Sequence, residues 1–389
     1  MNAPSTSPPT RPLKNPLASD AVTIVGYPFQ PTGMAEHTRS TFRAFRSAGV
    51  TPRLLDVADA NRSLDPDLER DFGPHIVTAL GEGVNLFGIN GDEAARVIEK
   101  VGEQAFSRGY NIAYPAWELA RYPKIWAETL DRFDEIWAPS AFVQQALEGV
   151  VTRPVHRMPL PVDLKLSSFL GRRHFGIPEE AFAVVFFFDF ASYAERKNPN
   201  AVLAAFERLA ARRPEADIHC VIKSRGGRDI DEAQAALEAR LAALGSRAQA
   251  IYGDLSDNEI KNLVRVADVF VSLHRSEGFG RGMAEAMAMG RPAIATGYSG
   301  NLDFMPPGTG LLVDYELVPV AAGAYPHGEG QVWADASPEH ASRLIEQLLD
   351  DPAGARALGG RAKTFMAEHY SVEALGRRYV ERLAAIVRS

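Results

Sequence analysis

Residues 272–292 have the sequence SLHRSEGFGRGMAEAMAMGRP, and this segment is the most informative in the chain. An apolar run ends at Leu273, a glycine-rich turn carrying Glu277 follows, and an amphipathic stretch begins near Arg281 and carries Glu285. The order apolar run, glycine-rich turn and amphipathic stretch predicts a buried strand, a tight turn and a helix. The segment therefore indicates one unit of a parallel α/β sheet with polar groups at the strand end.

The turn and helix carry groups suited to a phosphorylated sugar ligand. Gly278 and Gly280, on either side of Phe279, let backbone N–H groups approach a ligand closely, and the helix N-terminus that follows favours a diphosphate. Glu277 is placed to accept hydrogen bonds from sugar hydroxyls, and the two oxygens of Glu285 suit both hydroxyls of a ribose. The alternative is a ligand-free unit with a solvated Glu277 and with Glu285 on a polar helix face.

The rest of the chain alternates in the same way from about residue 21 onwards. The apolar run in segment 21–27 ends at Gly26, as a buried parallel strand does, and 34–48 has the pattern of a helix. We therefore expect an α/β fold with two doubly wound, Rossmann-like domains. The other expected strands are 75–80, 110–114, 135–138, 183–188, 218–222, 249–252, 269–273, 292–296 and 310–313. The other expected helices are 201–211, 230–244, 257–266, 281–289 and 372–387.

Composition divides the chain into four parts. Residues 1–18, rich in Pro, Ser and Thr, are expected to form a disordered leader. Residues 19–163 are expected to form the first domain and 164–371 the second, with the terminal helix 372–389 packing back on the first. Ligands of such sheets bind at the carboxyl ends of the strands, so the expected site is a central cleft between the facing domains.

Bulk composition excludes several classes of function. The chain has 389 residues, and 46% of them are apolar, enough to build two packed cores. Its net charge of −7 argues against nucleic acid as a main partner. Its single cysteine, Cys220, lies in an apolar run, so it is expected to be a buried strand residue in a reducing compartment. No stretch approaches the ~20 apolar residues that span a bilayer. These observations predict a cytoplasmic protein with at most peripheral contact with the inner face of a membrane.

The spacing of Glu277 and Glu285, in EGFG followed by AEAMAMGRP, resembles the signature of the family 4 retaining glycosyltransferases, which have the GT-B architecture of two Rossmann-like domains. The resemblance extends over roughly 22–383 and is more specific in the C-terminal half. It implies that Glu277 contacts the donor sugar and that Glu285 holds the nucleotide ribose.

A second motif, FDFASYAERKNP at 188–199, follows the first strand of the second domain. Lys197 at a helix start suits a diphosphate. Family members generally carry an arginine a few residues before this lysine, but here that position is Ser192, and Arg196 is the candidate replacement. The motif resembles a sub-group of bacterial surface-polysaccharide mannosyltransferases with F-D-x-x-S and R-K-N-P. The alternative is a solvated, basic helix start.

Two further segments are expected to complete the donor site. Ser299, Gly300 and Asn301 follow another strand, where backbone N–H groups suit a sugar or phosphate, although a ligand-free turn fits equally well. The resemblance implies that Asp254 and Leu255 lie where the family cradles the nucleotide base.

The first domain is expected to supply the acceptor side. The resemblance implies that the loop containing Gly33 contacts donor phosphates and that Glu36 and Arg39 face the acceptor. Trp117 fits a sugar platform or plain core equally well, and Glu118 suits acceptor hydroxyls. Many family members carry a histidine in this region, and none is evident here.

Other patterns are interpreted as structural. The D-x-D sequences at 229–231 and 65–67 are expected to be a helix cap and a polar loop, not metal sites. Arg39, Arg43 and Arg46 share one side of the first helix, which is expected to be a solvated face.

The sequence thus predicts a retaining, metal-independent transferase without a cofactor, moving a hexose from a nucleotide-diphosphate sugar to a glycan or lipid-linked acceptor. The sub-group favours GDP-mannose. Because no general base is evident, we expect the leaving phosphate to take the acceptor proton, rather than a double displacement through Glu118 or Glu277. The alternatives are a nucleotide-sugar epimerase of the same architecture and a non-catalytic nucleotide-sugar binding module.

Overall fold

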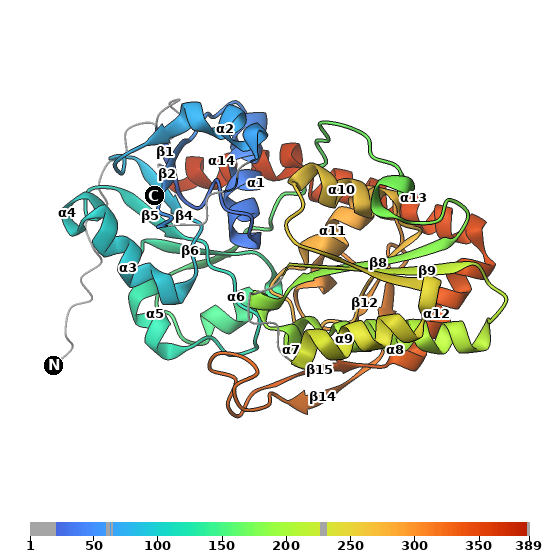
Figure 1. Ribbon diagram of the computed structural model, residues 1–389. Helices are drawn as coiled ribbons and strands as arrows, with labels where there is room; N and C mark the ends of the chain where they lie inside the picture. The colour runs from blue at the N-terminus through green and yellow to red at the C-terminus, as the bar shows by residue number, and fades with distance from the viewer. Residues whose placement is uncertain (1–20, 60–62, 64, 226–231, 387–389) are drawn as a thin grey trace.

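The computed structural model describes residues 21–59, 63, 65–225 and 232–386, and it forms two parallel β-sheets, each flanked by helices (Figure 1). The expected leader and the D-x-D sequence at 229–231 lie outside the described residues. Two Rossmann-like domains of this kind confirm the predicted α/β class.

The first sheet has seven parallel strands in the order β3-β2-β1-β4-β5-β6-β7. Its strands are β1 Val22–Gly26, β2 Arg53–Asp56, β3 Ile76–Val77, β4 Val84–Phe87, β5 Tyr110–Ala113, β6 Glu135–Ala138 and β7 Val155–Arg157. The strand order reverses between β1 and β4, so the loops after these two strands meet at one point of the sheet edge.

The second sheet has six parallel strands in the order β10-β9-β8-β11-β12-β13. Its strands are β8 Phe182–Asp189, β9 Ile218–Arg225, β10 Ala248–Tyr252, β11 Val269–Ser272, β12 Ala293–Thr296 and β13 Leu311–Val313. Its order reverses between β8 and β11, and Cys220 is a buried residue of β9, as predicted. The two motifs singled out in the sequence follow β8 and β11, the two neighbouring strands at this reversal.

Helices connect the strands, and the last one returns to the first domain. α14 (Val372–Ile386) packs against α1 (Gly33–Ser47), with the Ser47 hydroxyl donating to the carbonyl of Val372 at 2.8 Å (Figure 1). The other helices are α2 Pro66–Phe72, α3 Gly91–Val101, α4 Glu103–Phe106, α5 Lys124–Leu130, α6 Ala141–Glu148, α7 Ala194–Lys197, α8 Pro199–Arg212, α9 Glu232–Ala243, α10 Asp257–Val266, α11 Arg281–Ala288, α12 Pro338–Asp350 and α13 Pro352–His369.

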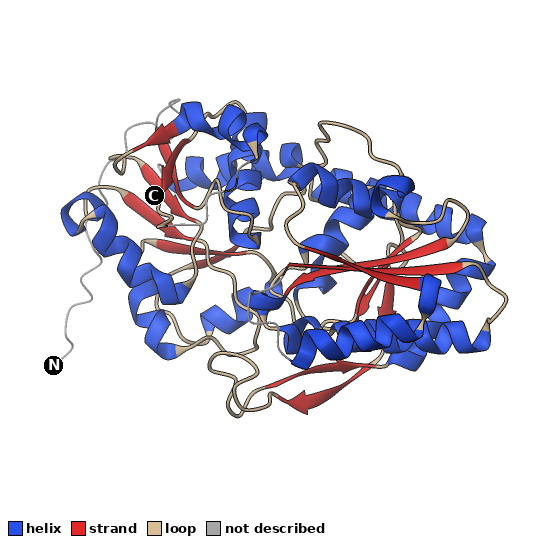
Figure 2. Cartoon of the chain, viewed as in Figure 1, coloured by secondary structure: helices blue, strands red, loops and turns tan. Residues whose placement is uncertain are grey.

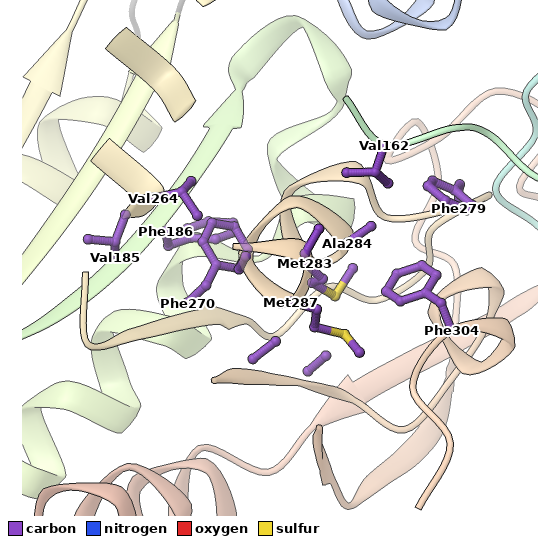
Figure 3. Close-up of a cluster of buried hydrophobic side chains, with 14 of the residues drawn as sticks. Val162, Val185, Phe186, Val264, Phe270, Phe279, Met283, Ala284, Met287 and Phe304 are labelled. Atoms are coloured by element: carbon purple, nitrogen blue, oxygen red, sulfur yellow. The ribbon is translucent and has the colours of Figure 1, made fainter. Parts of the chain in front are cut away.

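The helix α11 is fixed by a continuous apolar core (Figure 3). Met283 and Met287, one turn apart, lie on the same side of α11 and are both buried, with Phe270 of β11 and Phe304 in the same cluster. Full burial of one such side chain stabilises the fold by about 1.5–3 kcal/mol. The packing therefore holds the N-terminus of α11 and Glu285, on another side of the helix, in fixed positions.

A two-stranded antiparallel hairpin, absent from the sequence prediction, leaves the second domain at its edge (Figure 2). Its strands are β14 (Tyr315–Pro319) and β15 (Val332–Ala336), and the loop 320–331 between them reaches the first domain. The amide of Arg121 donates to the Gln331 side chain at 2.9 Å. The loop is rich in Gly and Ala, so its sequence carries no periodic pattern that would predict a structural role.

The strand prediction for the first domain was partly wrong. Instead of a strand over 75–80 there is only β3, two residues long, with Ile76 36% exposed at the sheet edge. The central strand β4 was missed because its apolar run is interrupted by Asn85. This side chain is buried, and its amide nitrogen donates to the side-chain oxygen of Asn111 on β5 at 3.0 Å, so the donor of this polar residue is satisfied inside the sheet.

Candidate active site

Arg196, Lys197 and Glu277 meet where β8 and β11 end. The Lys197 ammonium lies 2.5 Å from Oε1 of Glu277, and Nη1 of Arg196 lies 3.2 Å from the same oxygen. Glu118 of the first domain is 3.8 Å from Nη2 of Arg196. Because β8 and β11 are neighbours in the sheet, residues 80 positions apart in the chain form one charged cluster at the domain boundary.

The two cations are presented by a strained turn. Arg196 and Lys197 form the end of the one-turn helix α7, between Tyr193 (φ 64°) and Asn198 (φ 53°), both in left-handed conformations that cost free energy for non-glycine residues. The sequence predicted that Lys197 opens a helix. Instead, Lys197 ends the short helix α7, and the long helix α8 begins only at Pro199. Arg196 donates from Nη1 to the carbonyl of Ser276 at 3.0 Å, which ties this turn to the turn that carries Glu277.

The cluster shifts the pKa values of its members. Burial opposes ionisation of Glu277, but Lys197 and Arg196 outweigh it and lower its pKa to about 2. Burial lowers the pKa of Arg196, but Glu277 and Glu118 more than offset it, so the net pKa is raised. Burial lowers the pKa of Lys197, Glu277 opposes this, and Arg196 adds to it, with a net decrease. Glu277 is thus a carboxylate at neutral pH, held between two cations.

The turn after β12 holds the backbone of Glu277 through two hydrogen bonds. The Glu277 amide donates to the Ser299 hydroxyl at 2.9 Å, and the Gly300 amide donates to the Glu277 carbonyl at 2.9 Å. Ser299 has φ 75° and ψ −148°, a conformation otherwise confined to glycine. Asn301 is fully buried, and its side chain contacts His274 at 3.1 Å and donates to the Thr296 carbonyl at 3.0 Å. The Asn301 side chain therefore braces the turn from its interior.

The glycines of the EGFG motif serve the backbone in two ways. A Cβ on Gly278 would lie 2.5 Å from the carbonyl oxygen of Trp117, so the missing side chain permits close contact between the domains. Gly280 has φ +100° and precedes α11 without a capping side chain, so no side chain competes with an anion for the first N–H groups of the helix. Phe279 is 5% exposed and packs on Phe304 at 5.1 Å between ring centroids, so it is a core residue.

Glu285 lies buried in α11, close to the first domain. It is 5% exposed, and burial raises its pKa to about 7, against the opposing charges of Arg281 and Lys261. Arg281 reaches across the boundary, with Nη2 donating to the Ser40 hydroxyl on α1 at 3.4 Å. A buried carboxyl that titrates near neutral pH at a domain boundary is typical of a binding site.

The other expected donor residues lie around this cluster. Ser192 is partly buried, and its carbonyl accepts from Nη2 of Arg196 at 3.2 Å. Asp254 is largely exposed and lies 3.6 Å from Arg225, while the neighbouring Leu255 is partly buried. Gly33 is exposed at the start of α1. Arg225 also donates to the carbonyl of Pro31, which brings the Gly33 loop to the end of β9.

Arg39 and Glu36 have a structural position that the sequence did not reveal. Arg39 is 5% exposed, pairs with Glu36 at 2.7 Å and donates to the carbonyls of Pro28 and Gln30 at 3.1 and 2.9 Å. Arg43 pairs with Glu36 at 3.2 Å. The prediction of a solvated arginine face is therefore wrong for Arg39 and Arg43 and holds only for Arg46.

Trp117 lies in the core of the first domain, which favours that alternative over a sugar platform. It is 3% exposed, its indole donates to the carbonyl of Arg121 at 3.0 Å, and its ring packs edge-on against Tyr325 at 5.5 Å. Glu118, the next residue, is partly exposed and accepts a hydrogen bond from the Tyr325 hydroxyl. Sequence reasoning missed Tyr325, which the hairpin loop brings to the site from a part of the chain without a motif.

The second D-x-D sequence caps a helix. Oδ1 of Asp65 accepts from the amide of Asp67 at 2.9 Å at the start of α2, so this segment is a helix N-terminus and not the predicted polar loop. Within the described ranges, no group of three or more His, Cys, Asp or Glu side chains is arranged to hold a metal ion. No helix in the described part of the chain has the length and apolar character needed to cross a bilayer.

Comparison with known proteins identifies the second domain. Residues 174–365 match the model of the glycosyl transferases group 1 family. A D-inositol 3-phosphate glycosyltransferase from Arthrobacter sp. (strain FB24) is 30% identical over 205 residues, 51% of this chain and 42% of that protein. A mannosylfructose-phosphate synthase from Agrobacterium fabrum is 33% identical over 112 residues, 28% of this chain and 24% of that protein. The chain thus spans less than half the length of these relatives.

The fold matches solved structures over nearly the whole chain. HepE from Anabaena, solved with UDP and glucose, has a TM-score of 0.69 at 14% identity, covering 95% of this chain and 100% of that one. Sucrose-phosphate synthase from Thermosynechococcus elongatus has a TM-score of 0.65 at 15% identity, covering 94% and 99%. Residues 174–365 therefore belong to the group 1 glycosyl transferases, within a chain of the two-domain GT-B architecture that resembles family 4.

Proposed function

We propose that this chain is a retaining, metal-independent glycosyltransferase that moves a hexose from a nucleotide-diphosphate sugar to a glycan or lipid-linked acceptor. One observation carries the proposal. Arg196 and Lys197, after β8, converge on Glu277, after β11, at the strand reversal where doubly wound sheets bind ligands. The family match over residues 174–365 supports it.

Each part of the site fits one part of the donor. Lys197, Arg196 and the open N-terminus of α11 suit the diphosphate, because two cations and a helix dipole attract the same anion. Glu277, ionised between the cations, suits the hydroxyls of the donor sugar. Glu285, whose two oxygens can accept from adjacent hydroxyls, suits the ribose.

The chemistry follows from the placement of positive charge. The bond between the anomeric carbon and the β-phosphate oxygen breaks, and the acceptor oxygen bonds to the same carbon on the same face. The acceptor proton passes to the leaving phosphate oxygen, and the cations stabilise the charge that grows there. In this scheme Glu277, whose Oε1 is held by Lys197 and Arg196, orients the sugar.

GDP-mannose is the proposed donor, used in the cytoplasm for bacterial surface-polysaccharide assembly. The F-D-x-x-S and R-K-N-P motifs support this assignment. A GDP-mannose-dependent mannosyltransferase from Corynebacterium glutamicum is 27% identical over 201 residues, which also favours it. UDP and UDP-glucose occupy HepE, whose likeness concerns the fold, so UDP-sugars belong in the same test.

The test combines binding and turnover. GDP-mannose, UDP-glucose and their nucleoside diphosphates are first ranked by thermal shift, since a ligand of the native state raises the melting temperature. The best donor is then incubated with pooled glycan and lipid-linked acceptors, with Lys197→Ala as the matched inactive variant. We expect acceptor-dependent release of the nucleoside diphosphate and a product with the donor's anomeric configuration by NMR.

Each of the other outcomes would assign a different function to this protein. An altered sugar or free nucleoside diphosphate formed equally fast without acceptor indicates an epimerase. Thermal protection without turnover across the acceptor panel indicates a binding module. An inverted anomeric centre removes the retaining assignment.

A further inference from the structure

The hairpin loop 320–331 brings one aromatic side chain into contact with the charged cluster. Tyr325 is 8% exposed and belongs to the apolar cluster of the first domain, although it is a residue of the second. Its ring lies 5.5 Å from that of Trp117 and 4.8 Å from that of Tyr193. Tyr325 therefore bridges the two domains next to the site.

The hydroxyl of Tyr325 makes a directed contact with the first domain. It donates to Oε2 of Glu118, and burial together with this carboxylate raises the pKa of Tyr325 well above 10. The phenol thus stays protonated at neutral pH and remains a donor. This bond holds the Glu118 carboxylate, whose other oxygen lies 3.8 Å from Arg196.

The ring of Tyr325 faces Arg196. The guanidinium carbon lies 5.8 Å from the ring centroid, within the range of a cation–π contact. The Nε atom of Arg196 is buried without a hydrogen-bond partner among the residues that the structure describes. The aromatic ring is therefore part of the environment that stabilises this desolvated cation, alongside Glu277 and Glu118.

Tyr325 also supports the strained turn before α7. Tyr193 has φ 64° and precedes Arg196 by three residues, and its ring packs edge-on against Tyr325. A strained conformation persists only when the surrounding packing holds it. One residue of the hairpin thus contacts the cation, its carboxylate partner and the turn that presents the cation.

We propose that Tyr325 is a positioning residue for sugar transfer, which fixes Arg196 and Glu118 in the arrangement that the leaving diphosphate requires. It acts through Arg196 and does not touch the reacting atoms. The inference rests on the proposed function, in which Arg196 stabilises the charge that develops on the phosphate. Because Tyr325 lies on the second domain and Glu118 on the first, it also links the Arg196 position to contact between the domains.

The test uses graded substitutions in the full chain. Tyr325→Phe keeps the ring and removes the bond to Glu118, and Tyr325→Leu removes both. We expect kcat to fall by about fivefold in the first and by about 100-fold in the second, with the donor KM changed less than threefold, because the lost interactions strengthen in the transition state. Leu317→Ser, at a residue 55% exposed on the same hairpin, is the matched control and should keep the wild-type kcat.

A double substitution separates positioning from simple destabilisation. If Tyr325 acts through Arg196, adding Tyr325→Leu to Arg196→Lys should slow the reaction by less than threefold beyond Arg196→Lys alone. Multiplicative losses, or a kcat for folded Tyr325→Leu within twofold of the wild type, would overturn the proposal. Loss of folded protein in the leucine variant leaves the decision to Tyr325→Phe, for which an unchanged kcat would have the same meaning.

The inference can fail separately from the proposed function. If the wild type transfers no sugar, the proposed function falls, and titration with GDP and UDP then decides the positioning role. A free nucleoside diphosphate carries the phosphate charge that the donor develops only in the transition state. Unlike the donor KM, affinity for the tighter ligand should therefore drop about tenfold in Tyr325→Leu and stay unchanged in Leu317→Ser. Equal affinity in Tyr325→Leu and the wild type would overturn the inference.

Discussion

Two buried clusters in this molecule have nearly the same composition. In α1, Glu36 pairs with Arg39 and Arg43, and at the ends of β8 and β11, Glu277 pairs with Lys197 and Arg196. In both, neighbouring cations hold the pKa of the glutamate well below its usual range despite burial. Composition and pKa direction therefore do not distinguish the structural cluster from the candidate active site.

The clusters differ in where their remaining donors go. Nη1 of Arg39 donates to the carbonyls of Pro28 and Gln30, so Arg39 closes the loop before α1. The Lys197 ammonium has Glu277 as its one hydrogen-bond partner within the described ranges, although it carries three donors. The site that binds an anion is therefore indicated by N–H donors that remain without a partner on a strained turn, and not by buried charge alone.

The largest expected effect separates the clusters directly. Lys197→Ala should lower kcat by about 10²–10³-fold, the loss typical of removing one preorganised donor to a developing negative charge. The melting temperature should fall only slightly, because the Lys197 side chain is partly exposed and Arg196 remains paired with Glu277. Steady-state release of nucleoside diphosphate measures kcat, with Lys124→Ala, an exposed lysine on α5, as the control. A kcat within threefold of the wild type would remove Lys197 from the phosphate site.

The second expected effect is on stability in the other cluster. Arg39→Ala leaves two backbone carbonyls without their donor, which should cost about 2 kcal/mol of unfolding free energy. The kcat of the folded fraction should stay within about threefold. Urea unfolding and active-site titration measure the two quantities separately. A large drop in kcat at unchanged stability would instead support the predicted role of Arg39 in binding the acceptor.

The third expected effect concerns Glu285 and pH. Because burial raises its pKa to about 7, the carboxyl is protonated below that pH and ionised above it, and only the carboxylate accepts bonds from both ribose hydroxyls. Affinity for the donor should therefore rise as pH increases through about 7. Glu285→Gln should lower affinity about tenfold at pH 8 and abolish the slope, since charged hydrogen bonds contribute about 1.5–3 kcal/mol.

Calorimetric titration of the intact nucleotide sugar between about pH 6 and 8 measures this slope without the titrating terminal phosphate of a nucleoside diphosphate. A slope that persists in Glu285→Gln would assign the pH dependence to another group.

The smallest expected effect is that of chelation. If Lys197, Arg196 and the α11 N-terminus supply the positive charge, excess EDTA should leave the transfer rate unchanged. Complete loss of activity restored by Mg²⁺ or Mn²⁺ would show that these groups do not suffice.

Much of the fold could be predicted because its cores are periodic. The helix 257–266 and the strands of the second domain lie within a few residues of their expected positions, since the apolar runs of most of these strands are uninterrupted. β4 was missed because Asn85 breaks the run, and its buried partner on β5 is far away in sequence. Local patterns identify faces of elements, not the distant groups that satisfy a buried polar side chain.

The same distinction applies to the site. The motifs placed Glu277 and Lys197 at strand ends, and the strand order brings them together. The sequence could not reveal that Arg39 reaches two carbonyls, because a long side chain gives no sign of its partners. Tyr325 was missed for a related reason: the loop that carries it has no periodicity, and its position follows from contact with Trp117.

The central claim is that the Lys197 cluster binds the donor diphosphate. Calorimetric titration of GDP and GMP, and of UDP and UMP, into the wild type and Lys197→Ala tests it most directly. For the base that binds, we expect the wild type to prefer the diphosphate to the monophosphate by about tenfold or more, and Lys197→Ala to lose most of this preference. An equal preference for the diphosphate in both proteins would show that Lys197 does not bind the diphosphate.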